Sequence, residues 1–141
     1  MNPVRVPLKA IVIIHDRQIS RHGGAPGLRD GGLLEMGWAR PMNLAAYGAA
    51  DHAALAAAHA FGIAKAHAFV DGNKRTAFVA ALTFLRLNGH GFRPDPAEGV
   101  RMMEDLACGV IGETGFAEWL RQGLVAIRGV GGGTPDVPPF G

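Results

Sequence analysis

The apolar and polar positions along this chain predict a succession of helices joined by short turns rich in Gly, Pro and Asp. Asp30 and Asp51 each precede an apolar segment, where a carboxylate caps a helix by accepting hydrogen bonds from free N–H groups. Pro41 should end the second helix, and Thr114 should cap the last one. Little sheet is expected beyond a short hairpin. The expected helices cover 8–21, 33–40, 52–67, 73–88, 96–110 and about 114–123.

The fourth of these segments is apolar on almost every side. A helix without a polar face is buried among other helices, so this segment should be the central helix of the bundle. Its N-terminus would then be held rigidly, and the most polar string of the sequence lies there. The apolar residues are Ala77, Phe78, Val79, Ala80, Ala81, Leu82, Phe84, Leu85 and Leu87.

Composition narrows the fold class. The 141 residues suit one domain, 48% of them are hydrophobic, and only 7% are aromatic. Ala dominates the apolar set and favours helix over strand, which predicts an all-α bundle of about six helices. The Gly- and Pro-rich end, 129–141, should be a flexible tail after a catalytic domain at 1–128.

Charge, cysteine content and hydropathy argue against a nucleic-acid surface, an internal disulfide, a metal site and a membrane span. The net charge of +2 is too small to indicate a nucleic-acid surface. Cys108 is the single cysteine, so no internal disulfide can form, and the scattered histidines lack metal-ligand spacing. No export signal or membrane span of roughly 20 apolar residues is visible. We therefore expect a cytoplasmic protein with no membrane or direct nucleic-acid partner.

The string from His67 to Arg75 carries the candidate chemistry. A helix N-terminus presents free N–H groups and the positive end of the helix dipole, which together bind anions, and Gly72 lets a phosphate approach closely. Lys74 and Arg75 stand in this first turn, where the dipole opposes cations, so a bound polyphosphate would reverse an unfavourable interaction. Asn73 can orient phosphate oxygens.

Two further side chains complete a phosphoryl-transfer set. His67 titrates near neutral pH and can take a proton from an attacking hydroxyl. Asp71 is a hard oxygen ligand suited to Mg²⁺. The alternative is structural: Asp-Gly-Asn is an ordinary turn, Asn an ordinary cap, and exposed Lys-Arg pairs are common.

The whole string resembles a known motif. It matches the Fic-family pattern His-x-Phe-x-Asp/Glu-Gly-Asn-Gly-Arg, and Lys74 in place of the second glycine makes it more similar to the Doc (death-on-curing) toxins. Segment 14–27 resembles the first helix and the following loop of these toxins, and segments 75–77 and 84–89 resemble their central helix. The matching positions are His67, Phe69, Asp71, Gly72, Asn73, Lys74 and Arg75.

The resemblance implies a Fic/Doc-like helical fold and a role for each matching residue. His67 would be the general base, Asp71 would hold Mg²⁺, and residues 72–75 would bind the phosphates of ATP, with Lys74 and Arg75 also catalytic. A loop that includes Gly23, Gly24, Pro26 and Gly27 would be a flap that positions the target segment.

The same resemblance implies the biology. Doc toxins transfer the γ-phosphoryl group of ATP to a hydroxyl of elongation factor Tu, which halts translation, and a Phd-type antitoxin neutralises them. Fic enzymes instead transfer AMP, and the Asp71-Gly72 pair is the Fic-like one, so nucleotidyl transfer is the alternative. A third hypothesis is that the protein is a catalytically inactive binding module with the Fic fold.

Overall fold

The computed structural model describes residues 3–127, which form a helical bundle with one very small sheet. The expected tail at 129–141 lies outside these residues, as does the proposed domain boundary at 128. The all-α prediction is confirmed. Within the described part of the chain, no helix is both long enough and apolar enough to cross a membrane. The elements are α1 (Leu8–His22), α2 (Gly31–Ala46), α3 (His52–Ala66), α4 (Asn73–Leu87), β1 (His90–Gly91), α5 (Pro96–Cys108), α6 (Glu113–Gly123) and β2 (Val125–Ala126).

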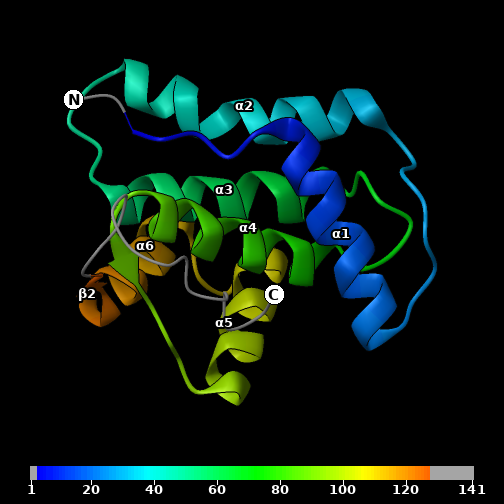
Figure 1. Cartoon of the computed structure of the whole chain (residues 1–141). Helices are drawn as coiled ribbons and strands as arrows, with labels where there is room; N and C mark the ends of the chain where they lie inside the picture. The colour runs from blue at the N-terminus through cyan, green and yellow to red at the C-terminus, as the bar shows by residue number, and fades with distance from the viewer. Residues whose placement is uncertain (1–2, 128–141) are drawn as a thin grey trace.

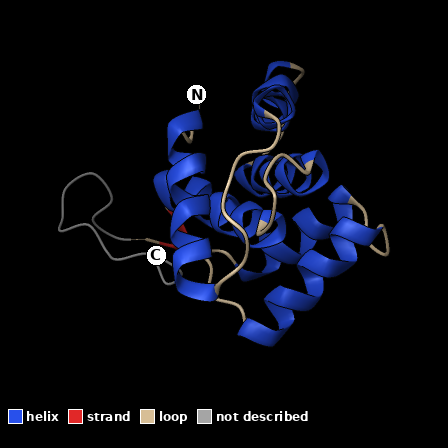
Figure 2. Ribbon diagram, turned by 90° about the vertical axis from the view of Figure 1, so that its right-hand side faces the viewer, coloured by secondary structure: helices blue, strands red, loops and turns tan. Residues whose placement is uncertain are grey.

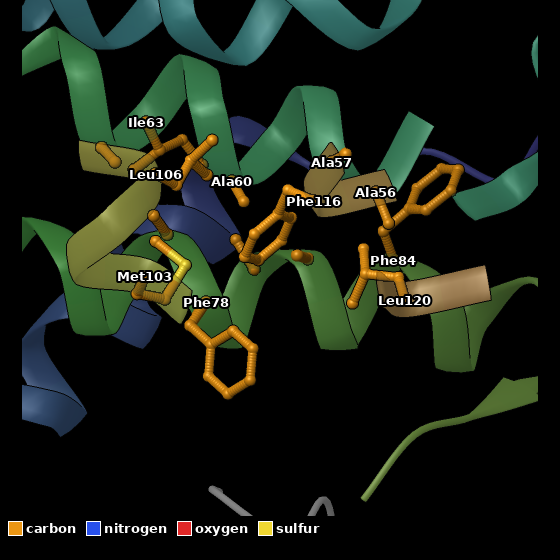
Figure 3. Close-up of a cluster of buried hydrophobic side chains, with 14 of the residues drawn as sticks. Ala56, Ala57, Ala60, Ile63, Phe78, Phe84, Met103, Leu106, Phe116 and Leu120 are labelled. Carbon is orange, nitrogen blue, oxygen red and sulfur yellow. The ribbon is translucent and has the colours of Figure 1, made fainter. Parts of the chain in front are cut away.

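Two helices share the centre of the bundle. α4 is buried, as its apolar sequence predicts, and α3 is buried along most of its length as well. α2 packs on one side of α3 and α6 on another, while α1 packs against α4 (Figure 1). Side chains from α3, α4, α5 and α6 meet in the core, among them Ile63, Phe84, Leu106 and Phe116 (Figure 3). The N-terminus of α4 is therefore anchored from several sides.

The prediction that Pro41 ends the second helix is wrong, because α2 continues through it to Ala46. Proline cannot donate the hydrogen bond that the carbonyl of Gly37, four residues earlier, would normally accept. Gly37 lies where α2 crosses α3 against Gly62. A Cβ atom on either glycine would lie 2.5 Å from the carbonyl oxygen of the other. Tight packing between the two helices thus compensates for the local defect, and Pro41 is buried in the same region.

The expected caps are mostly confirmed. The side chain of Asp30 accepts a hydrogen bond from Leu33 N at 3.0 Å, and that of Asp51 accepts one from Ala54 N at 2.9 Å. The prediction for Thr114 is wrong, since α6 begins one residue earlier, at Glu113, after Gly112. An acidic residue in the first turn suits the positive end of the helix dipole, so the helix can start there without a side-chain cap.

Two loops run beside each other at one end of the bundle (Figure 2). The loop between α1 and α2, residues 23–30, is the predicted flap and keeps that name below. It pairs with the loop between α3 and α4 through an antiparallel bridge of Leu28 with Phe69. Val70 N donates to Gly27 O at 3.0 Å, and Ala68 O accepts from the backbone N–H groups of Arg29 and Asp30. These hydrogen bonds place the flap directly against the polar string.

Candidate active site

His67 stands where α3 ends and the loop begins. Its φ of 49° is left-handed, and among residues 3–127 it is the one non-glycine residue with positive φ. A side chain in that conformation costs free energy, so the surrounding structure has to hold it there. The guanidinium of Arg29 on the flap donates a hydrogen bond to the carbonyl oxygen of His67. The imidazole is exposed and lines the cavity described below.

Asp71 is exposed, yet both of its carboxylate oxygens accept backbone hydrogen bonds. Gly72 N donates to Oδ1 at 2.8 Å, and Ala25 N on the flap donates to Oδ2 at 3.3 Å. These two bonds, with Gly72 first, lower the pKa of Asp71, and the nearby Arg75 and His15 act in the same direction. The carboxylate is thus held charged near neutral pH.

The flap can approach Asp71 because residue 24 is glycine. Gly24 has a φ of 115°, and a Cβ atom there would lie 2.7 Å from Asp71 Oδ2. Both the backbone conformation and the space therefore require glycine at this position.

The side chain of Asn73 closes the loop from inside. Its Oδ1 accepts from Phe69 N at 3.1 Å, and its Nδ2 donates to Phe69 O at 2.9 Å. Phe69 itself is buried in the core, so the loop is fastened to the bundle at its middle. α4 then begins after Gly72, which has no side chain to cap it. The backbone N–H groups of the first turn therefore receive no hydrogen bond from a capping side chain.

The two cations of the motif lie at this helix start. Lys74 is exposed, and Arg75 is half-buried because its Nη2 reaches back to donate to Gly23 O on the flap at 2.8 Å. Six predicted site residues share one cavity of about 380 Å³ with Ala64 of α3, Val70 and Ala107 of α5. These six are His67, Asp71, Gly72, Asn73, Lys74 and Arg75.

The predicted flap residues do not line this cavity, but three of them contact the loop beside it or the start of α4. Gly23 accepts from Arg75, Gly24 lies against Asp71, and Gly27 accepts from Val70. Pro26 is exposed in the same segment. A flap edge beside the cavity is consistent with the expected position for a target segment, and its role in target binding stays a prediction.

Sequence reasoning did not assign His15 of α1 to the site. In the structure it is buried against Phe69 and bonded to the backbone of Asp71. A signal for it exists in the sequence. Ile11 and Gln18 are buried on the same helix at spacings of four and three residues from His15, which places His15 on the inner face.

Comparison with known proteins decides the family. The family model described as the Fic/DOC family matches residues 5–85, which include the flap and the whole string from His67 to Arg75. The chain belongs to the Fic/Doc family.

Two relatives place the chain within the Fic/Doc family. It is 36% identical over 113 residues to the "Protein kinase doc" of Escherichia phage P1, covering 79% of this chain and 89% of that protein. It is 49% identical over 70 residues to the "Toxin Doc" of Mycolicibacterium smegmatis, covering 48% of this chain and 53% of that one. The expected resemblance to Doc toxins of the Fic/Doc superfamily is thereby confirmed.

Proposed function

We propose that this Fic/Doc protein is a toxin that transfers the γ-phosphoryl group of ATP to a Ser or Thr hydroxyl of a protein target. One observation carries the proposal. His67, Asp71, Lys74 and Arg75 converge on a single cavity at the N-terminus of a buried helix that has no side-chain cap. The name of the phage relative, a protein kinase, supports the same reaction class.

His67 is the proposed general base. Its exposed imidazole lines the cavity, where a target hydroxyl can reach it, and takes the hydroxyl proton as the oxygen attacks. The new bond forms between that oxygen and the γ-phosphorus. The bond from the γ-phosphorus to the bridging oxygen breaks, and ADP leaves with the electron pair.

The phosphates are proposed to lie over the first turn of α4. The uncapped amide groups, Lys74 and Arg75 all offer positive charge there, and such preorganised charge stabilises the charge spread over the transferring group. Arg75 is also bonded to the flap, so nucleotide binding and flap position are coupled through one side chain.

Asp71 is the proposed Mg²⁺ ligand. Among the described residues, no cluster of three or more His, Cys, Asp or Glu side chains is placed to hold a metal ion. A single carboxylate fits Mg²⁺ if the nucleotide phosphates and water supply the remaining ligands, as is usual for this ion. Each Asp71 oxygen keeps a free lone pair beyond its backbone hydrogen bond. When bound, Mg²⁺ would neutralise phosphate charge.

The proposed target is elongation factor Tu and the proposed inhibitor is a Phd-type antitoxin, both from the resemblance to Doc toxins. A second cavity of about 380 Å³ suits such an inhibitor. It is lined largely by apolar residues of α4 and α5, including Phe78, Val79 and Met103, and Lys74 and Arg75 border it too. An amphipathic antitoxin segment with an acidic residue would fill it and cover the phosphate site.

Transfer of AMP is the second candidate, favoured by the Asp71-Gly72 pair that Fic enzymes share. One experiment separates the two reactions. Elongation factor Tu is incubated with the protein, Mg²⁺ and ATP labelled at either the γ- or the α-phosphate, and His67→Ala is run in parallel. We expect γ-label on the target, lost in the variant. Transfer of α-label would establish the AMP reaction instead, and no transfer of either label would contradict both.

A further inference from the structure

His15 contacts the proposed catalytic loop from a different helix, 56 residues away in sequence. Its side chain is 1% exposed and lies on the inner face of α1. The imidazole ring is stacked on the ring of Phe69, with centroids 3.8 Å apart and planes 8° from parallel. Its Nε2 lies 2.7 Å from the carbonyl oxygen of Asp71. One side chain thus holds two residues of the loop.

The direction of this hydrogen bond is fixed by chemistry. A carbonyl oxygen can only accept, so Nε2 of His15 carries the proton and donates it. Nδ1 faces the exposed carboxylate of Asp16, whose Oδ1 lies 3.7 Å away. A buried polar side chain is stable only when its donors are satisfied, and the Asp71 carbonyl supplies the acceptor. Phenylalanine would preserve the stack but leave that carbonyl without this donor.

The hydrogen bond also sets the orientation of the peptide between Asp71 and Gly72. A trans peptide is planar, and its C=O and N–H groups point to opposite sides. Because His15 draws the Asp71 carbonyl toward α1, the N–H of Gly72 points away from α1. There it donates to Asp71 Oδ1 at 2.8 Å, the bond that does most to lower the pKa of this carboxyl.

We infer that His15 is a positioning residue for the transfer reaction. It fixes the Asp71–Gly72 peptide, and through it the Asp71 carboxylate, while its stack on Phe69 fixes the middle of the loop. The inference rests on the proposed function for its catalytic consequence. The geometric part, that His15 orders residues 69–72, can be tested without any transfer activity.

The test compares two substitutions of His15 with one matched control. His15→Phe keeps an aromatic ring for the stack and removes the donor, whereas His15→Gln keeps a donor and removes the ring. His59 offers the control. It is also buried, bonds through Nδ1 to the carbonyl of Leu55 at 2.9 Å and packs on Phe84, but it belongs to α3 away from the loop.

Two readouts are measured on each full-length variant. The first is amide hydrogen exchange at residues 69–72, and the second is the kcat and KM for phosphoryl transfer from Mg²⁺-ATP to elongation factor Tu. We expect His15→Phe to accelerate exchange at Gly72 and to lower kcat by about 10- to 100-fold, since small misplacements of reacting groups have effects of this size. KM for ATP should change less, because Lys74 and Arg75 remain in place.

His15→Gln should recover part of kcat, and His59→Phe should leave both the loop exchange and kcat close to wild type. The inference is overturned if His15→Phe exchanges and reacts like wild type, or if His59→Phe lowers kcat as much as His15→Phe does. If the wild-type protein transfers neither phosphoryl nor AMP, the proposed function fails. The exchange data then decide alone whether His15 orders the loop.

Discussion

Asn73 makes two hydrogen bonds to a single residue, Phe69, one with each polar atom of its side-chain amide. The pair joins the first residue of α4 to the middle of the loop before it. Because Phe69 is buried, this link fixes the loop between His67 and Asp71 relative to the core. The sequence pattern assigned Asn73 to phosphate binding. The structure gives its side chain a bracing contact, and one Nδ2 hydrogen is left for a phosphate.

Asn73→Ala should therefore destabilise the fold as well as the site. Removing the amide leaves the backbone groups of Phe69 without their partners, which typically costs about 1–3 kcal/mol. Urea denaturation measures the loss. Asn43 on α2, which is exposed, supplies the control, and Asn43→Ala should change the free energy of unfolding by no more than about 0.5 kcal/mol. Equal effects of the two substitutions would contradict the bracing role.

The left-handed backbone of His67 predicts that two inactive variants differ in stability. His67→Gly and His67→Ala both remove the imidazole, so neither should transfer phosphate. Glycine adopts a φ of 49° without strain, whereas alanine does not, so His67→Gly should be the more stable of the two by about 1 kcal/mol. Thermal or urea unfolding compares them directly, and a more stable His67→Ala would show that no strain is held there.

Two neighbouring flap glycines provide a matched test of the contact between flap and carboxylate. Gly23 and Gly24 both have positive φ, but a Cβ atom at Gly23 meets nothing within 4 Å, while one at Gly24 meets Asp71 Oδ2 at 2.7 Å. Gly24→Ala should lower kcat far more than Gly23→Ala, because only Gly24→Ala displaces Asp71. Steady-state transfer kinetics measure kcat for both variants. Similar losses of kcat would show that backbone strain, and not the contact with Asp71, causes them.

The buried His59 predicts a loss of stability in mild acid. Desolvation lowers its pKa from 6.5 to about 4, so the folded state disfavours the charged form. The unfolded chain then binds more protons than the folded one between these values. The contribution of His59 to the free energy of unfolding should be fully present above pH 6.5. It should fall by up to about 3 kcal/mol as the pH drops toward 4, and change little below that.

Urea unfolding at several pH values tests this dependence. His59→Phe has no group that titrates at this position, so its stability should be flatter than wild type between pH 6.5 and 4. Asp51, whose pKa the Arg121 hydrogen bond lowers to about 2, loses its contribution only at lower pH, from about 4 downward. A wild-type curve that stays flat from pH 6.5 to 4 would contradict the account of His59.

Local signals in the sequence predicted much of the fold. Asp30 and Asp51 were identified as caps because a cap is a bond to a residue three positions away. Pro41 shows the limit of such reasoning. Its local preference is to end a helix, and the contact that outweighs this preference, between Gly37 and Gly62, joins positions far apart in the chain.

The same limit applies to the site. The string from His67 to Arg75 is contiguous, so six of its seven cavity-lining residues could be named in advance. Apart from Asn73, the residues that hold the string in shape come from elsewhere: Arg29 and Gly24 from the flap, and His15 from α1. Only the packing of α1 and the flap against the loop brings them together, and no spacing rule encodes that packing.

The mass of elongation factor Tu after incubation with the protein and Mg²⁺-ATP tests the central claim most directly. The account predicts the addition of a single phosphoryl group to a Ser or Thr residue, and an unmodified factor when His67→Ala replaces the wild-type protein. An AMP adduct would assign the same cavity to the nucleotidyl reaction. A phosphoryl adduct that persists with His67→Ala would contradict the role of His67 as the base.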